Sequence, residues 1–158
     1  MKEIKKVLFV CTGNSCRSIM AEAYLKKRLA EEGLPVEVRS AGTLGMNGLR
    51  PTKEALEVLA DEGVEPEGYE SKTLTEDFIE WADIILVMEH MHRSRVLAMV
   101  PAAADKLFHL GKFNKKEDMS GEGALDILDP IGKSLDFYRE TFRLIKQSIE
   151  EFIKWLKK

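Results

Sequence analysis

Short apolar runs separated by helical repeats dominate the pattern of hydrophobic positions along this chain. The runs lie at Val7–Val10, Val36–Val38, Ile84–Val87 and Lys106–Leu110. They are rich in β-branched or large side chains, which is typical of strands covered on both faces. We therefore predict four strands at these places.

Between and after the runs, apolar residues recur at steps of three and four, as they do along one face of a helix. The pattern predicts helices that begin at Ile19, cover residues 55–59, follow Thr75, span Arg93–Val100 and run from Ser134 to the end of the chain. The acidic residues after Thr75 fit the first turn of a capped helix, and Pro101 stops the next helix. The polar, glycine-containing segment 114–123 predicts a mobile surface loop.

Strands that alternate with helices predict an α/β fold, in which helices cover both faces of a parallel sheet. The 158 residues fit a single domain that spans positions 1–158. In such folds ligands bind at the carboxyl ends of the strands. The loop after the first strand is therefore the first candidate for a functional site.

Composition and charge exclude several classes of function. Apolar residues make up 44% of the chain and charged residues 32%, as in a soluble globular protein. The net charge of −3 supplies no basic field for nucleic acid, and no apolar run approaches the roughly 20 residues that span a bilayer. The first residues do not resemble a signal peptide, and two cysteines within one loop are no disulfide framework. We expect a protein of the reducing cytoplasm without nucleic-acid or membrane partners.

The most informative segment runs from Cys11 to Ser18, between the first strand and the first helix. A helix that starts after a short polar loop points backbone N–H groups into a concavity that attracts anions. The Cys11 thiol lies in the same positive field, which favours its nucleophilic thiolate form. Arg17 can hold two oxygens of a tetrahedral oxyanion with its planar guanidinium. Together these residues indicate a thiolate directed at phosphorus.

Each of these residues also has an ordinary structural explanation. A cysteine after a strand is often a small buried hydrophobic residue, and glycine and asparagine are common in turns. An arginine in the first turn of a helix opposes the helix dipole. A bound anion would offset that unfavourable position, so the combined pattern favours the functional interpretation.

A candidate proton donor precedes the last helix. Transfer of a phosphoryl group to a thiolate requires a proton for the departing atom. Asp129 is followed by Pro130, which fixes its own φ and favours an extended conformation at Asp129. Asp-Pro is also a common turn, but together with the loop at Cys11 it predicts an acid that later activates water to hydrolyse a phosphocysteine.

These segments together resemble the low-molecular-weight protein tyrosine phosphatase family. The resemblance rests on Cys11-Thr-Gly-Asn-Ser-Cys-Arg-Ser18, Met20-Ala-Glu22, Ser40-Ala-Gly42 and Asp129-Pro130, and it covers essentially the whole chain. It implies a four-stranded parallel sheet with helices on both faces and a phosphate-binding loop after the first strand. It also implies that Cys11 is the nucleophile, Arg17 binds phosphate and Asp129 is the general acid, without a metal or another cofactor.

The resemblance assigns supporting roles to further residues. It implies that Ser18 donates to the thiolate and that Asn14 holds the strained loop through a hydrogen bond to Ser40. It also implies that Cys16 forms a reversible disulfide with oxidised Cys11. The remaining residues that it brings to the site are Thr12, Gly13 and Ser15 in the loop, and Leu44, Met46 and Ile131 as candidate contacts of the substrate. Ile19 replaces the family's usual proline, which pre-organises the helix but takes no part in the chemistry.

The resemblance implies a phosphorylated side chain as the substrate, with phosphotyrosine and phosphoarginine as the candidates. Family members specialised for phosphotyrosine usually have a bulky apolar residue at the position of Ser15 and aromatic residues after Asp-Pro, which stack on the substrate ring. Here Ser15 is small, and Ile131 and Gly132 follow Asp129-Pro130. Bacterial protein arginine phosphatases of this family have threonine at the Ser15 position, and a small hydroxyl residue leaves room for a guanidinium. We therefore favour phosphoarginine over phosphotyrosine.

Two other functions are disfavoured. Arsenate reductases with this fold share the cysteine loop, but their relay needs further cysteines near residues 88–96, where this chain has none. A phosphate-binding module without activity would lack Cys11, Arg17 or Asp129, and all three are present. The expected partners are therefore a phosphorylated protein or peptide as substrate and inorganic phosphate as product, with the chain acting as a monomer.

His90 and His92 form a pair that could in principle bind a metal ion. Only His109 accompanies them as a further imidazole, and no clear carboxylate cluster lies nearby in the sequence. We predict a rim or surface role for this pair and no metal site.

Overall fold

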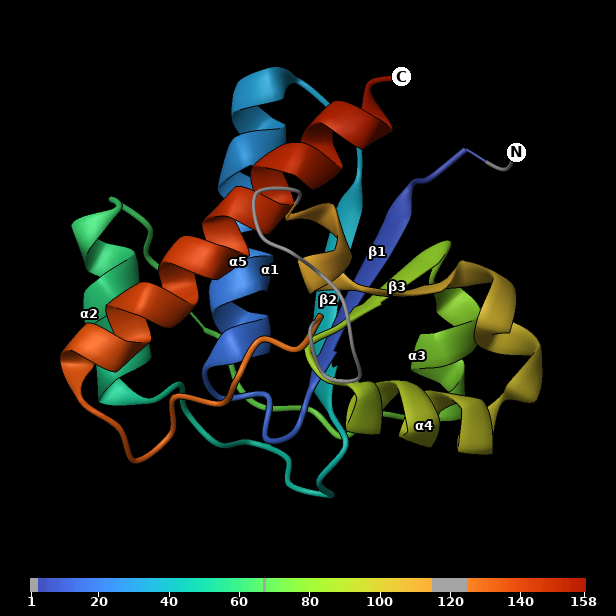
Figure 1. Ribbon diagram of the computed structural model, residues 1–158, viewed down its shortest axis with the longest axis horizontal. Coiled ribbons are helices and arrows are strands. Elements are labelled where there is room, and N and C mark those ends of the chain that lie inside the picture. The colour runs from blue at the N-terminus through green and yellow to red at the C-terminus, as the bar shows by residue number, and fades with distance from the viewer. Residues whose placement is uncertain (1–2, 67, 115–124) are drawn as a thin grey trace.

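The computed structural model describes residues 3–66, 68–114 and 125–158 (Figure 1). The strands are β1 (Lys6–Cys11), β2 (Glu37–Gly42), β3 (Ile84–Val87) and β4 (Leu107–His109), and they form one parallel sheet in the order β2-β1-β3-β4. This sheet confirms the predicted four-stranded parallel architecture. The surface loop predicted at 114–123 lies, except for Asn114, outside the described residues.

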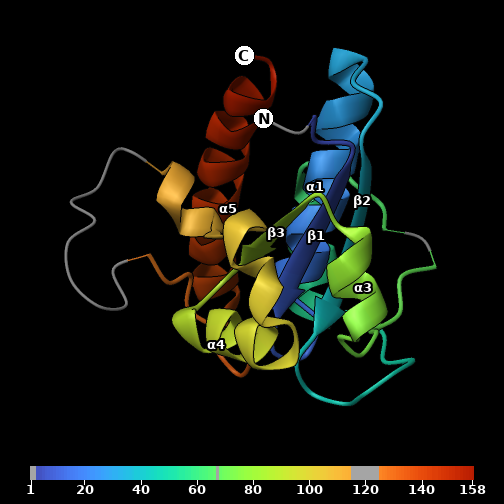
Figure 2. The same cartoon turned by 90° about the vertical axis from the view of Figure 1, so that its right-hand side faces the viewer.

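Helices cover both faces of the sheet, as predicted. The helices of one face are α1 (Arg17–Glu32), α2 (Lys53–Asp61) and α5 (Leu135–Leu156). Those of the other face are α3 (Glu76–Trp81), α4 (His90–Met99) and the short 3-10 helix η1 (Pro101–Lys106). A second 3-10 helix, η2 (Leu110–Phe113), follows β4. In the view turned by 90°, α5 and α3 stand on opposite sides of β1 and β3 (Figure 2). Within the described ranges, no helix is long and apolar enough to cross a membrane.

The alternation of side chains along β1 divides the core into two layers. Val7 and Phe9 pack with α1 and α5, whereas Leu8 and Val10 pack with residues of α3 and α4. All four side chains are completely buried. A strand covered on both faces needs apolar residues at every position, which is why the sequence shows an uninterrupted apolar run here.

Helix caps at Thr75 and Ser134 agree with the two helix starts predicted at these residues. The Thr75 side chain accepts the backbone N–H of Phe78 over 3.2 Å, and the Ser134 side chain accepts that of Phe137 over the same distance. Each cap satisfies one of the N–H groups that a helix leaves unpaired at its start.

Element boundaries differ from the prediction where polar residues take part in regular structure. Strand β2 begins one residue later than predicted and continues to Gly42, because its backbone pairs with β1 through the polar Ser40. Strand β4 lacks Lys106 and Leu110, which belong to the flanking 3-10 helices. Helix α4 begins at His90, three residues before the predicted start, and ends at Met99.

The carboxyl ends of the central strands meet at one edge of the sheet. In Figure 1 this edge faces the lower end of the molecule, where the loops after β1 and β2, the start of α4 and the segment before α5 come together. The C-terminal end of α5 lies at the opposite end. The parallel topology thus gathers four separate segments into one region.

Gly42 allows the end of β2 to approach the loop after β1. A Cβ atom at this position would lie 2.6 Å from the carbonyl oxygen of Thr12 and 2.9 Å from the backbone nitrogen of Asn14. Because both neighbours are backbone atoms, they cannot move aside as a flexible side chain could. Only glycine fits this contact.

We expect Gly42→Ala to lower the free energy of unfolding by about 1–3 kcal/mol, as overpacking does in a close-packed site. Gly45→Ala is the matched control, since a Cβ there meets no atom within 4 Å. Urea denaturation of both variants measures the difference. Equal stability of Gly42→Ala and the wild type would show that the loop after β1 can shift without cost.

Candidate active site

The loop after β1 surrounds the sulfur of Cys11 with hydrogen-bond partners. Cys11 is the last residue of β1 and is 1% exposed. The backbone N–H of Asn14 donates to its Sγ over 3.3 Å, and the Ser18 Oγ lies 2.9 Å from it. The N-terminus of α1 lies in the same loop. Hydrogen-bond partners and the N-terminal end of a helix therefore surround this sulfur.

Asn14 holds the loop in a conformation that few residues adopt. Its φ of 53° lies in the left-handed region, and its side chain is buried. The amide nitrogen donates to Ser18 over 2.7 Å and to Ser40 of β2 over 2.9 Å. Its oxygen accepts the backbone N–H of Lys72 over 2.9 Å. The predicted contact between Asn14 and Ser40 is therefore present, and Ser40 in turn donates to Glu22 of α1.

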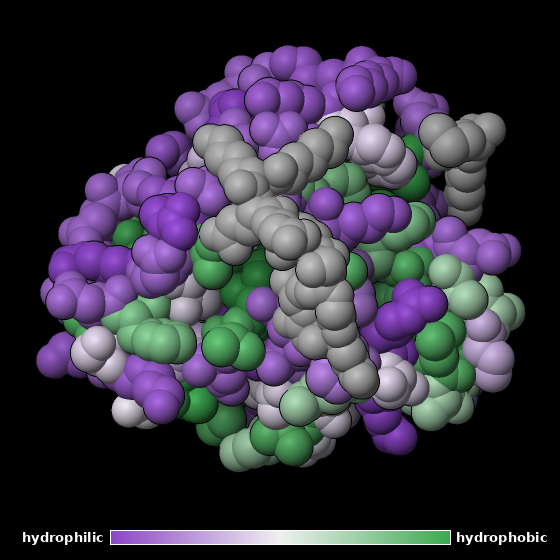
Figure 3. All heavy atoms as spheres, viewed as in Figure 1, coloured by the Kyte–Doolittle hydropathy of each residue, from purple (hydrophilic) through white to green (hydrophobic). Residues whose placement is uncertain are grey.

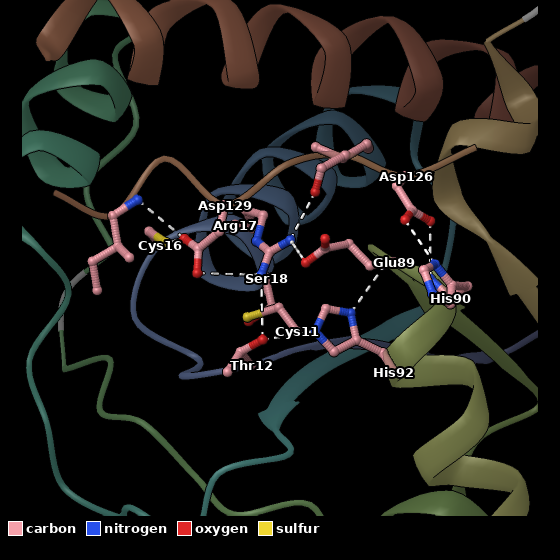
Figure 4. A network of polar contacts seen from close by, with 12 residues as sticks. Cys11, Thr12, Cys16, Arg17, Ser18, Glu89, His90, His92, Asp126 and Asp129 are labelled. Carbon is pink, nitrogen blue, oxygen red and sulfur yellow. Dashed lines mark hydrogen bonds and ion pairs between the residues drawn. The ribbon is translucent and has the colours of Figure 1, made fainter. Parts of the chain in front are cut away.

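Arg17, the first residue of α1, is held on one side by two acceptors (Figure 4). Its Nη1 donates to Glu89 Oε2 over 2.6 Å and to the carbonyl oxygen of Ile127 over 2.7 Å. The guanidinium is 1% exposed, so the Glu89 carboxylate supplies the charge that a buried cation requires. Glu89 is not among the site residues predicted from the sequence. The available signal was an acidic residue two positions after the end of a central strand, at the edge where ligands bind.

The other side of the Arg17 guanidinium has two long contacts at Nη2 and one donor, Nε, without a partner in the described part of the chain. Its Nη2 lies 3.5 Å from Asp129 Oδ2 and 3.4 Å from Thr12 Oγ1. Its Nε is buried and has no hydrogen-bond partner among the described residues. A buried N–H group without an acceptor costs about 1–3 kcal/mol. The Nε and Nη2 edge is the edge with which arginine grips two oxygens of an oxyanion.

The structure brings Asp129 to this loop from the segment before α5. Its Oδ1 accepts the backbone N–H of Ile131 over 3.0 Å, and the Cys16 thiol points at the same oxygen from 3.6 Å. Burial, with smaller contributions from the negative groups Cys11 and Asp129, raises the pKa of the Cys16 thiol well above its ordinary value. Cys16 is therefore a neutral thiol, and both cysteines are free.

Apolar side chains are exposed around the loop. Ser15 is largely buried in the loop itself, with 8% exposure. The exposed large apolar residues of the described chain are Leu44, Met46, Leu49, Met91, Leu128 and Ile131. They belong to the segment after β2, the start of α4 and the segment before α5, and hydrophobic atoms are likewise seen in the lower half of Figure 3. The backbone N–H of Leu44 donates to the Thr12 carbonyl over 3.0 Å, which ties one of these segments to the loop.

The two histidines of α4 differ in their surroundings. The His90 side chain is half exposed and contacts the Asp126 carboxylate over 2.9 Å, which fits the predicted rim position. The surface role predicted for His92 is wrong, since this residue is completely buried. Helix α4 starts earlier than predicted and turns His92 inward, where its Nε2 lies 2.9 Å from Thr12 Oγ1. Over the described ranges, no cluster of three histidine, cysteine or acidic residues is arranged to hold a metal ion.

A family model described as low molecular weight phosphotyrosine protein phosphatase matches residues 6–158. The chain belongs to this family. It is 38% identical over 152 residues to a protein-arginine-phosphatase of Bacillus subtilis, and the alignment covers 96% of this chain and 97% of that protein. It is 32% identical over 154 residues to the low molecular weight protein-tyrosine-phosphatase Etp of Escherichia coli K12, with coverages of 98% and 96%.

Solved structures of this phosphatase family share the fold. The YwlE arginine phosphatase, as a Cys-to-Ser mutant with a phosphorylated active site serine, matches with a TM-score of 0.87 at 36% identity, covering 97% of this chain and 96% of that chain. A low molecular weight protein tyrosine phosphatase of T. tengcongensis matches with a TM-score of 0.85 at 34% identity, with coverages of 95% and 98%. The chain is therefore a hydrolase of the low molecular weight phosphatase type.

The buried His92 of this phosphatase makes its stability depend on pH. Burial, assisted by the positive charge of Arg17, lowers the pKa of His92 from 6.5 to about 4. Below pH 6.5 the unfolded chain takes up a proton at His92 while the folded chain does not. The contribution of neutral His92 to the free energy of unfolding is thus present above pH 6.5 and is lost as the pH falls toward 4.

We expect the wild type to lose about 2–3 kcal/mol more unfolding free energy than His92→Gln between pH 7 and pH 4.5. Urea denaturation at a series of pH values measures both curves. The carboxylates titrate in both proteins, so the difference between the curves isolates His92. Parallel curves would show that His92 is not held neutral in the folded state.

Proposed function

We propose that this chain is a cysteine-dependent protein phosphatase that hydrolyses phosphorylated side chains through a phosphocysteine intermediate. The observation that carries the proposal is the buried Arg17, which offers an unpaired Nε in the same loop as the Cys11 sulfur. An oxyanion bound there would satisfy the unpaired Nε of the guanidinium and offset the position of this cation at a positive helix end. Family membership supports the same conclusion.

In the first step, the Cys11 thiolate attacks phosphorus, an S–P bond forms, and the bond to the departing atom breaks. Asp129 supplies the proton that this atom needs. The loop N–H groups and Arg17 stabilise the charge on the phosphoryl oxygens. The relative that carries a phosphorylated serine in its active site supports a covalent intermediate of this kind.

In the second step, the Asp129 carboxylate takes a proton from water, which attacks the phosphocysteine. The S–P bond breaks, inorganic phosphate leaves, and the thiolate is restored. The place of Asp129 beside the loop supports both roles, since its Oδ2 lies 3.5 Å from Arg17 Nη2 and its Oδ1 3.6 Å from Cys16 Sγ. One carboxyl group therefore serves as acid and then as base.

We further propose that phosphoarginine is the preferred substrate. Ser15 is small, and Ile131 and Gly132 stand directly after Asp129-Pro130, where an aromatic residue would stack on a tyrosine ring. Tyr138 does not replace it, because its side chain is buried in the core with 1% exposure. The protein-arginine-phosphatase of Bacillus subtilis supports this choice. Phosphotyrosine is the second candidate, supported by relatives named tyrosine phosphatases.

Leu44, Met46 and Ile131 are proposed contacts of the substrate's protein part, since their apolar side chains are half exposed, at 50%, 47% and 55%. We also propose a monomer in a reducing cytoplasm. Both cysteines are free thiols, and the proposed nucleophile Cys11 must stay reduced to act, which fits a reducing compartment.

If Asp129 is the proton donor, Asp129→Ala slows turnover most for substrates whose departing group is a strong base. We expect a loss of roughly 10²–10⁴-fold for such substrates and a smaller loss for aryl phosphates that leave without a proton. Initial rates over a series of substituted phenyl phosphates measure this dependence. Asp136→Ala, an exposed aspartate in the first turn of α5, is the matched control, and Cys11→Ser is the inactive reference. An equal loss for all departing groups would exclude Asp129 as the donor.

The substrate preference is tested with phosphoarginine and phosphotyrosine peptides of the same flanking sequence. We expect the wild type and Ser15→Thr to favour phosphoarginine. Ser15→Ile should shift the ratio of kcat/KM toward phosphotyrosine, because the bulkier apolar side chain removes room and polarity from the pocket. A wild type that prefers phosphotyrosine would contradict the proposed substrate while leaving the mechanism intact.

A further inference from the structure

His92 joins the start of α4 to the loop that holds Cys11. Its ring is completely buried, and both ring nitrogens are engaged. The Nδ1 accepts the backbone N–H of Glu89 over 3.0 Å, and the Nε2 lies 2.9 Å from Thr12 Oγ1. The ring thus bridges two segments that lie 80 positions apart in the sequence.

The hydrogen bonds fix the tautomer of this ring. A backbone N–H can only donate, so Nδ1 must be the unprotonated nitrogen. In the neutral ring the proton then resides on Nε2, which donates to the Thr12 hydroxyl oxygen. A doubly protonated ring would lose the bond from Glu89. The contact with Thr12 therefore has one direction, from the histidine to the hydroxyl.

The Thr12 hydroxyl, which accepts the hydrogen bond from His92, also contacts Arg17. Its Oγ1 lies 3.4 Å from Arg17 Nη2, on the side of the guanidinium that faces Asp129. Glu89 holds the opposite nitrogen, Nη1, over 2.6 Å. Two neighbouring groups at the start of α4 thereby determine the plane of the guanidinium, Glu89 by direct contact and His92 through Thr12.

We propose that His92 is a positioning residue, which acts through the Thr12 hydroxyl to aim the free edge of Arg17 at the phosphoryl group. The inference rests on the proposed function, because it assigns that edge to a bound oxyanion. Pre-organised donors stabilise developing charge without having to reorient during the reaction, so a guanidinium fixed on both sides binds the transition state better than a loose one.

A purely structural role for His92 is the competing explanation. Its bond to the Glu89 N–H caps helix α4, and the ring fills space between the helix and the loop. Two substitutions separate these roles. In His92→Asn the side-chain oxygen can take the place of Nδ1 and keep the helix contact, but no group reaches Thr12. In His92→Gln the amide nitrogen can take the place of Nε2 and keep the contact with Thr12.

We expect His92→Asn to lower kcat/KM for p-nitrophenyl phosphate about tenfold, the factor that corresponds to the loss of one hydrogen bond. Binding of inorganic phosphate should weaken by a similar factor. His92→Gln should recover most of both values, although its helix contact is lost and its thermal unfolding temperature falls. Thr12→Val should resemble His92→Asn, and the double variant should be no worse than Thr12→Val alone, because both changes remove the same contact.

Three kinetic outcomes would overturn the proposal. They are wild-type kinetics for a folded His92→Asn, equal losses for the asparagine and glutamine variants, and additive losses in the double variant. The ¹⁵N chemical shifts of the His92 ring test the tautomer independently of activity. A protonated Nδ1 in the folded wild type would refute the bridge even if the phosphatase mechanism holds. An inactive wild type that shows the predicted tautomer would refute the proposed function alone.

Discussion

The burial of one arginine at the start of a helix is the constraint on which the site depends. Arg17 places a positive charge, 1% exposed, at the positive end of α1. Such a charge is tolerated only where nearby acceptors compensate it. The compensation comes from Glu89 after β3 and from Ile127 and Asp129 before α5. Two segments far apart in the sequence are therefore held at the carboxyl edge of the sheet by a single guanidinium.

The strand order decides which residues can meet this requirement. Because β1 lies between β2 and β3, its loop has a neighbour on each side. On the side of β2, Ser40 supports the strained Asn14, and Gly42 makes room for the loop backbone. On the side of β3, Glu89 and His92 hold the guanidinium and the Thr12 hydroxyl. The two neighbours thus have different tasks, since one shapes the backbone and the other orients the charge.

Local patterns were sufficient to predict the strands and the residues of the loop. Apolar runs located all four strands, and the spacing from Cys11 to Arg17 identified the anion-binding loop, because both signals lie within a few residues. Glu89 and His92 could not be found in this way. Their contacts depend on β3 lying beside β1, and the early start of α4 depends on a bond between a backbone N–H and a histidine ring, which no hydrophobic pattern records.

The unpaired Nε of Arg17 lowers the stability of the folded protein, and the same group is the donor that we propose for substrate binding. Without a ligand, the protein buries a donor that has no acceptor in the described structure, and it bears the cost of that group in its folded state. Filling the position with a protein acceptor would make the fold more robust but would occupy the edge that we propose for the oxyanion. On that proposal, the site gives up stability at this one group in return for a place where an anion can bind.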